Sequence, residues 1–474
     1  MGRKRLELFE NDLEVFDINK LGMGVSKTNE GVICFIKNAV PGDIVDVKIF
    51  KKRKGYFEAE PIKWLKKSAF RTQPICQHFG ICGGCKLQHI SYEGQLKFKE
   101  NSVLNDLNHI GKTKIEDVLP IVGSKNQYYY RNKLEFSFSN NRWLTSEEIL
   151  KDKLIDRNGL GFHKPGMWDK IVDIEKCHLQ ANPSNEIRNT IKDFAQKNKL
   201  DFFNPRKQSG LLRSLMIRNT IKGELMVLVQ FYKEDKEMRE ALLSYIFSKF
   251  PKINSLLYCI NSKANDSIYD QKINVFKGEK FITEYIEKLK FKITAKSFFQ
   301  TNPEQAKVLY SIVKDFASIK SHEIVYDLYT GTGTIALILA NLCSKIIGIE
   351  SVPEAIEAAK DNAKHNKVEN IFFETGDIKN LFNDDFIKKY GKADVLITDP
   401  PRSGMHSNVI KQILKLEPNR IVYVSCNSST QARDIIHLKE KYFVIKSQAI
   451  DMFPQTPHVE NVVLLYHKNL NEKY

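Results

Sequence analysis

Residues 323–350 read EIVYDLYTGTGTIALILANLCSKIIGIE, and this stretch decides the fold. An apolar strand is predicted over 323–329, a glycine turn over 331–333, a helix over 334–343 and a second strand over 345–350. Strand, turn, helix and strand in this order are typical of a doubly wound α/β sheet. Glycines in such a turn let the backbone approach a ligand closely, and the start of the helix offers free N–H groups.

Glu350, at the end of the second strand, predicts the kind of ligand. It lies nineteen residues after Gly331, where an acid can accept hydrogen bonds from both hydroxyls of a ribose. We therefore expect a cofactor with an adenosine-like ribose. The spacing Gly331-x-Gly333-x-x-Ala336 also fits a dinucleotide fingerprint, so the loop alone leaves NAD and a purely structural turn open.

The alternation of strands and helices continues to the C-terminus. A helix is predicted over 352–366, and further strands over 371–374, 393–399 and 420–425. Two last strands, 442–451 and 461–466, follow each other without a helix, so we expect an antiparallel pair at the sheet edge. This predicts a Rossmann-like doubly wound domain over residues 286–474.

Polar side chains follow two of these predicted strands. Asp399 and the rigid Pro400-Pro401-Arg402 follow one apolar strand, and Cys426 follows the next. The carboxyl ends of the strands are where open α/β sheets bind ligands. The alternatives are an ordinary helix-start acid and a buried, inert thiol, but the polar Asn427-Ser428-Ser429 favours a crevice for Cys426.

A cysteine in such a crevice suits one chemistry. Carbon 6 of uracil is electrophilic through its conjugation to the carbonyl at position 4, and a thiolate that adds there makes carbon 5 nucleophilic. The reaction then needs a base for the proton on carbon 5. Glu460 precedes the final strand and is the candidate, against a solvated strand-end carboxylate. The amide of Gln300 is a candidate for binding the cofactor or the base edge, against a polar loop residue.

Residues 1–68 predict a small β-barrel. Short β-branched runs at 15–18, 31–36 and 43–49 alternate with glycine and proline turns. The end of this unit is basic and aromatic: nine Lys and Arg residues lie between positions 48 and 71, against two acids, among Phe50, Tyr56, Phe57 and Trp64. Such a surface suits a nucleic-acid strand. The alternative is a strand edge protected by lysines.

Composition agrees with a polyanionic partner. The chain carries a net charge of +16 with a pI near 9.2. Its length of 474 residues predicts two or three domains, and the 42% of hydrophobic residues is enough for globular packing. The alternative is a protein that merely has many lysines. No apolar run is long enough for a bilayer and the first residues lack a signal-peptide core, so we expect no membrane association, a cytoplasmic location and reduced cysteines.

Four cysteines predict an inorganic site. Cys76, Cys82 and Cys85 lie in one glycine-containing loop, and Cys177 follows much later. This spacing fits either tetrahedral zinc or a 4Fe-4S cluster, against unrelated thiols. The surrounding residues 69–285 contain strand-like stretches at 134–138 and 225–229 and a basic-polar insert over 139–158, predicted as a loop with a helix.

Six motifs together resemble the RNA 5-methyluridine methyltransferase family. In chain order they are Phe298-Phe299-Gln300-x-Asn302, Asp327-Leu328-Tyr329-x-Gly331-x-Gly333, Gly348-Ile349-Glu350, Asp399-Pro400-Pro401-Arg402, Ser425-Cys426-Asn427 and His458-Val459-Glu460. By this resemblance Cys426 is the nucleophile and Glu460 the proton acceptor. The residues implied to contact S-adenosylmethionine or the uracil are Gln300, Tyr329, Gly331, Glu350 and Asp399. Asp377 fits the position of an acid that contacts adenine.

The resemblance also implies the architecture and the substrate. Residues 1–68 resemble a TRAM RNA-binding barrel, which is OB-like. Residues 69–285 would form an α+β domain whose four cysteines hold a 4Fe-4S cluster, and residues 286–474 the methyltransferase domain. Family members with both features mostly resemble 23S ribosomal RNA enzymes, so 23S rRNA and a monomer are expected, with transfer RNA as the alternative. Two rivals of other classes are a non-catalytic RNA-binding scaffold and an NAD-linked or iron–sulfur redox enzyme.

Overall fold

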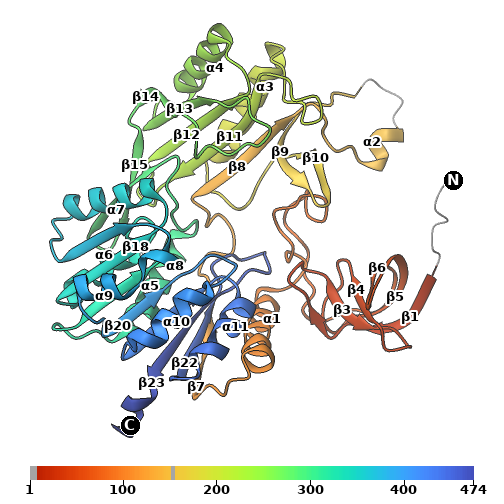
Figure 1. Cartoon of the computed structure of the whole chain (residues 1–474). Helices are drawn as coiled ribbons and strands as arrows, with labels where there is room; N and C mark the ends of the chain where they lie inside the picture. The colour runs from red at the N-terminus through yellow and green to blue at the C-terminus, as the bar shows by residue number, and fades with distance from the viewer. Residues whose placement is uncertain (1–7, 151–154, 474) are drawn as a thin grey trace.

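The computed structural model describes residues 8–150 and 155–473, which contain a six-stranded, a seven-stranded, a two-stranded and an eight-stranded β-sheet (Figure 1). The helix expected in the 139–158 insert is α2 (Ser146–Leu150), and residues 151–154 of that insert lie outside the described residues. Among the helices in these two ranges, none is both long and apolar enough to cross a membrane.

The N-terminal sheet has the order β1-β5-β6-β4-β3-β2. Its strands are β1 (Leu8–Glu14), β2 (Asp17–Ile18), β3 (Gly24–Lys27), β4 (Ile33–Ile36), β5 (Ile44–Arg53) and β6 (Tyr56–Lys66). Val45, Val47 and Ile49 of β5 are buried because alternating side chains share one face of a strand. The basic residues lie mainly on β5 and β6, in stretches that pair with each other but extend past the printed pairing with β1 and β4. Protection of a strand edge therefore stays open beside RNA binding.

The central sheet has the order β10-β9-β8-β11-β12-β13-β14 and is covered by two helices. Its elements are β8 (Lys133–Ser139), β9 (Gly159–Lys164), β10 (Met167–Asp173), α3 (Ser184–Lys197), β11 (Leu212–Asn219), β12 (Leu225–Phe231), α4 (Lys236–Lys249), β13 (Ser255–Ile260) and β14 (Asn274–Gly278). Leu215 and Val227 pack in a core with α3 and α4. Met216 and Leu228, on the opposite face, belong to a core that continues into the C-terminal sheet. The strands are thus buried on both faces.

The hairpin β15 (Phe281–Ile286) and β16 (Leu289–Thr294) leads into the eight-stranded sheet, whose order is β19-β18-β17-β20-β21-β23-β22-β7. Its strands are β7 (Asp117–Val122), β17 (Ile324–Leu328), β18 (Lys345–Glu350), β19 (Ile371–Thr375), β20 (Val395–Thr398), β21 (Arg420–Ser425), β22 (Tyr442–Ile450) and β23 (Glu460–His467). The accompanying helices are α5 (Pro303–Ala317), α6 (Thr334–Leu339), η2 (Ala340–Leu342), α7 (Pro353–His365), α8 (Ile378–Leu381), α9 (Asp384–Tyr390), α10 (Ser407–Leu416), α11 (Ser428–Leu438) and η3 (Lys468–Lys473).

The doubly wound sheet is confirmed, with one correction at its edge. Strands β19, β18, β17, β20 and β21 are parallel, and β22 and β23 form the expected antiparallel pair. That pair is not at the edge, because β7 pairs with β22 beyond it. β7 contains Pro120 and comes from a distant part of the chain, so no local pattern announces it.

The segment before β7 also packs on the C-terminal sheet. Helix α1 (Tyr92–Asn105) and the single π-turn η1 (Asp106–Ile110) lie beside α11, as the orange and blue ribbons in Figure 1 show. Lys99 of α1 is 3% exposed and its Nζ lies 2.6 Å from Oδ1 of Asp451, which is fully buried. The boundaries 1–68, 69–285 and 286–474 remain a proposal, and residues 92–122 pack across the last of them.

Replacing Lys99 with methionine should destabilise the fold strongly. Asp451 would keep a buried charge without its partner, which typically lowers the free energy of unfolding by about 3–5 kcal/mol. The measurement is the unfolding midpoint in guanidinium chloride. Lys388→Met, which breaks the exposed pair with Asp385, is the control and should leave the midpoint unchanged. Equal midpoints for both variants would contradict a stabilising role for the buried pair.

Candidate active site

The predicted site residues gather at one edge of the eight-stranded sheet. Glu350 ends β18, Tyr329 follows β17, Asp399 follows β20 and Cys426 follows β21, and these four strands are parallel. Their carboxyl ends therefore meet at the same edge. Glu460 begins the antiparallel β23, which brings the start of that strand to the same edge.

The register of β21 and β23 brings Cys426 and Glu460 together. Ser425 lies opposite Asn461 in this register, and Cys426 and Glu460 are the chain neighbours of these two residues. The charge of Glu460 acts on the Cys426 thiol, so the two side chains lie near each other. Burial raises the pKa of the Cys426 thiol to about 11, and the charges of Glu460 and Asp399 act in the same direction.

Two carboxyl groups at this edge have raised pKa values. Glu460 is 5% exposed, and burial together with the nearby charge of Asp399 raises its pKa well above the usual range. Burial raises the pKa of Asp399 to about 7. A buried carboxylate with a raised pKa is a stronger base than an ordinary one, which suits the removal of a proton from carbon.

The turn after β17 is open on one side. Gly331 has φ 56°, and a Cβ added there would meet no atom within 4 Å. Glu350 holds the turn, because its Oε2 accepts a hydrogen bond from the Gly331 N–H at 3.2 Å, while Oε1 accepts from the Val352 N–H at 3.0 Å. Tyr329 also has a positive φ, 64°, and burial raises the pKa of its phenol to about 12.

Asp327 adds an unpaired acceptor beside this turn. It is 1% exposed, and its Oδ2 accepts a hydrogen bond from Thr330 Oγ1 at 2.5 Å. Among the described residues its Oδ1 has no close hydrogen-bond partner. Burial raises the pKa of the carboxyl to about 7, although Thr330 and the backbone of Ala336 act in the opposite direction. A buried carboxylate oxygen of this kind fits the amino group of a cationic amino-acid ligand. With the open turn and Glu350, it suits an amino-acid-bearing nucleoside.

Asp327 and Arg402 are two further charged residues at this edge, and the local sequence pattern predicted no role for either. The guanidinium of Arg402 lowers the pKa of both Cys426 and Glu460, opposing the effect of burial. Arg402 Nη2 lies 3.4 Å from Nδ1 of His458. The signal available in the sequence was position: Asp327 and Arg402 each lie at or just after the end of an apolar strand.

Gln300 and Asp377 lie apart from the Cys426–Glu460 pair. Gln300 is half-buried before α5, and its carbonyl accepts a hydrogen bond from Asn132 Nδ2 at 3.2 Å. Asp377 is exposed and caps α8, where it accepts from the Lys379 N–H at 3.2 Å. Its hydrogen bonds with Lys379 lower the pKa of its carboxyl.

The four predicted metal-site cysteines share one pocket. Cys76, Cys82, Cys85 and Cys177 line it together with the apolar Phe79, Phe162, Ile174 and Leu179. Burial raises the pKa of Cys85 to about 12, and the charges of the other three thiols add to this effect. Within residues 8–150 and 155–473, no group of three or more His, Cys, Asp or Glu is arranged to hold a metal ion. The structure thus brings the thiols together without forming a single-ion site.

Two family models match this chain. The model described as tRNA (Uracil-5-)-methyltransferase matches residues 219–468, more than half of the chain, and the TRAM domain model matches residues 11–62. A protein of Bacteroides thetaiotaomicron described as an uncharacterized RNA methyltransferase is 50% identical over 448 residues, which cover 94% of this chain and 98% of that one. A protein of Porphyromonas gingivalis with the same description is 48% identical over 464 residues, covering 96% and 99%.

A solved structure also matches over nearly the whole chain. It is the crystal structure of Pyrococcus abyssi tRNA (uracil-54, C5)-methyltransferase in complex with S-adenosyl-L-homocysteine. The TM-score is 0.74 at 29% sequence identity, and the match covers 95% of this chain and 99% of that one. The arrangement of barrel, central sheet and C-terminal sheet therefore has a counterpart of known structure.

Proposed function

Because the chain belongs to the tRNA (uracil-5-)-methyltransferase family and carries a TRAM domain, we propose that it methylates carbon 5 of a uridine in RNA through a covalent adduct with Cys426. The observation that supports the adduct is the register of β21 and β23, in which Ser425 lies opposite Asn461, so that their chain neighbours Cys426 and Glu460 come to the same edge of the sheet. A nucleophile for carbon 6 and a base for the proton on carbon 5 are then available on one pyrimidine. A non-catalytic scaffold would need neither group.

The residues at the sheet edge would hold S-adenosylmethionine. The unpaired Oδ1 of Asp327 suits the amino group of the cofactor. The open turn at Gly331 lets the protein backbone approach the cofactor closely, and the Glu350 carboxylate suits its ribose hydroxyls. We also propose Tyr329, Asp399, Gln300 and Asp377 as residues that contact the cofactor or the uracil. When bound, S-adenosylmethionine supplies an electrophilic methyl group.

The chain's own residues would perform the remaining steps. The target uridine leaves its stack and enters the crevice. The Cys426 thiolate adds to carbon 6, and the electron pair of the carbon 5–carbon 6 double bond moves toward the carbonyl at position 4. Once carbon 5 carries the methyl group, Glu460 takes its proton. The double bond forms again and the Cys426 thiolate leaves.

For the four cysteines we propose a 4Fe-4S cluster rather than zinc. Each iron of such a cluster takes one thiolate, so the four sulfurs lie farther apart than the ligands of a single ion. A shared pocket that lacks a single-ion site is compatible with this arrangement. Anaerobically purified protein should contain about four iron and four sulfide ions per chain, and Cys177→Ser should lose them. Zinc in their place would reject the cluster.

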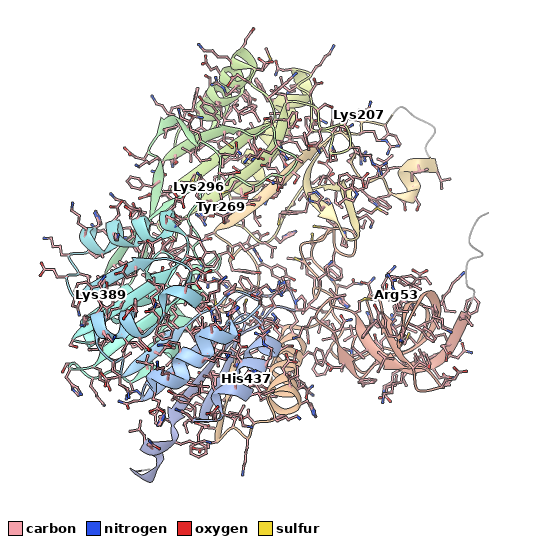
Figure 2. The ribbon with its side chains drawn as sticks, viewed as in Figure 1. Arg53, Lys207, Tyr269, Lys296, Lys389 and His437 are labelled. Carbon is pink, nitrogen blue, oxygen red and sulfur yellow. The ribbon has the colours of Figure 1, made fainter. Side chains whose placement is uncertain are left out.

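The barrel supports RNA binding on its basic face. Lys37 Nζ lies 3.9 Å from the centre of the Phe50 ring, and the Arg71 guanidinium lies 5.3 Å from that of Trp64. Phe50 and Trp64 are each 38% exposed, so cations and aromatic faces occur together on the surface. Figure 2 shows Arg53 on this barrel, and Lys207, Tyr269 and Lys296 on the rest of the chain. Phosphates and bases of one strand suit such a surface.

We propose 23S rRNA as the substrate, with the protein acting as a cytoplasmic monomer. The combination of a TRAM domain and a four-cysteine pocket supports this choice. The matched Pyrococcus abyssi enzyme methylates uracil 54 of tRNA, which makes tRNA the second candidate.

The test compares the two RNAs directly. Purified protein and S-adenosylmethionine are incubated with unmodified 23S rRNA or tRNA transcripts, and 5-methyluridine is measured by mass spectrometry of the digested nucleosides. We expect about one methyl group per 23S rRNA transcript and none in tRNA. The reverse pattern would replace rRNA by tRNA. Methylation of neither RNA, or a product other than 5-methyluridine, would reject the proposed function.

A further inference from the structure

The loop between β22 and β23, residues 451–459, is held in place by distant parts of the chain. The carbonyl of Phe453 accepts a hydrogen bond from Lys99 Nζ at 3.1 Å, and that of Pro454 accepts one from the Tyr130 hydroxyl at 3.0 Å. Lys99 is on α1 and Tyr130 precedes the central sheet. This loop leads directly into Glu460, the first residue of β23, so it adds to the pairing with Ile450 that holds this residue.

Gln455 is the most tightly held residue of this loop. It is 2% exposed and has φ 70°, a left-handed conformation that a non-glycine residue keeps only when its surroundings impose it. Its carbonyl accepts hydrogen bonds from the N–H groups of Lys86 and Leu87 at 2.8 and 3.0 Å. Lys86 follows Cys85, so backbone hydrogen bonds connect the four-cysteine loop to the loop before Glu460.

Gln95 of α1 completes this attachment with one side chain. Its Oε1 accepts a hydrogen bond from the Gln455 N–H at 2.9 Å, and its Nε2 donates to Gln455 Oε1 at 3.0 Å. The same amide also donates to the carbonyl of Ile90 at 2.9 Å. Gln95 is 1% exposed, so no water replaces these bonds when they are lost.

A shift of Gln455 should be transmitted to Glu460. Pro454 and Pro457 flank it on either side, and proline fixes φ near −65°. Across Pro457, the Thr456 hydroxyl accepts a hydrogen bond from the His458 N–H at 3.3 Å. The loop therefore has few dihedral angles with which to absorb a displacement.

We propose that Gln95 is a positioning residue that aligns the Glu460 carboxylate with the pyrimidine by fixing Gln455. This rests on the proposed function of Glu460 as the base. Gln95 itself touches neither RNA nor cofactor. Its loss should slow the removal of the carbon 5 proton more than it affects substrate binding or the addition of Cys426.

The test compares Gln95→Leu with Gln180→Leu. Gln180 is a matched control: it is also 1% exposed, and its amide also donates to a carbonyl, of Ile217, and to a side chain, of Asn219. Gln95→Leu should lower kcat on the order of ten- to a hundredfold, the scale of a small misplacement, with little change in KM. The covalent protein–RNA adduct should accumulate on ordinary RNA, and amide hydrogen exchange over 452–460 should be faster. Gln180→Leu should show none of these changes.

A second variant keeps the proposal testable if Gln95→Leu does not fold. Gln455→Gly relieves the left-handed backbone conformation but loses the side-chain bond to Gln95, so it should fold and still accumulate adduct. Adduct levels equal to the wild type in these variants would overturn the proposal. RNA containing 5-fluorouridine distinguishes a failure of this proposal from a failure of the proposed function. Fluorine on carbon 5 cannot leave as a proton, so the adduct should be trapped whether or not Glu460 is correctly placed. A wild-type protein that forms no adduct on that RNA would reject the Cys426 mechanism itself.

Discussion

Cys426→Ala should retain RNA binding and lose methylation. Alanine removes the only proposed group that can make carbon 5 nucleophilic, and ordinary uracil does not react with a methyl donor at this carbon. Loss of an enzyme's nucleophile lowers kcat by on the order of 10⁴-fold or more. The measurement is methyl incorporation into the RNA substrate over a time course, with the dissociation constant for RNA measured on the same preparation.

The control for this experiment is Cys343→Ala. Cys343 lies in the same sheet domain, just after η2, and is also largely buried, at 8% exposed. Its sulfur contacts the carbonyl of Leu339, not the crevice. This variant should remain active. A fully active Cys426→Ala protein would rule out covalent catalysis by this thiol, and loss of RNA binding in it would point to misfolding instead.

Glu460→Gln should trap the protein on its RNA. Glutamine has nearly the same shape but cannot take the proton from carbon 5, so the methylated adduct forms and does not resolve. Loss of a general base typically lowers the rate of the step that it catalyses by about 10²–10⁴-fold. In this protein that step is the removal of the carbon 5 proton, which follows methyl transfer. Denaturing gel electrophoresis should show a protein–RNA band that grows to one adduct per active site, while multiple turnover nearly stops.

Asp399 is the competing base, because burial raises the pKa of its carboxyl to about 7 and it lies close enough to Glu460 to influence its pKa. Asp399→Asn should lower the rate without trapping the adduct. If Asp399→Asn accumulates adduct and Glu460→Gln turns over rapidly, the two roles are exchanged. Glu440→Gln, on an exposed acid after α11, is the control for the amide substitution and should behave as the wild type.

Much of this site was predictable because its signals are local. Asp399 and Cys426 each follow an apolar strand, and the polar residues after them mark the point where each strand ends. Parallel strands share one carboxyl edge, so strand ends far apart in the sequence could be placed together. Local pattern predicted no role for Asp327 and Arg402, because the features that single them out are an unpaired buried oxygen and a charge that acts on Cys426 from another segment.

The edge strand and the attachments of the 451–459 loop could not be predicted in the same way. Lys99 and Asp451 are 352 positions apart, and Gln95 and Gln455 are 360 apart. In the local sequence around each of these four residues, a polar side chain would be expected at the surface. β7 is a short strand with a proline, and it pairs only because α1 places it beside β22.

The amino-acid sequence alone determined the alternation of strands and helices from residue 323 onward, the glycine turn and the residue types that end those strands, because periodicity and turn chemistry act over a few neighbouring residues. Tertiary structure alone decided the register that brings the start of β23 beside the end of β21, the addition of β7 beyond β22, and the hold of residues 86–99 on the loop before Glu460. Burial is the physical reason, because a polar or charged group removed from water is costly unless it has a partner, and that partner can come from any part of the folded chain.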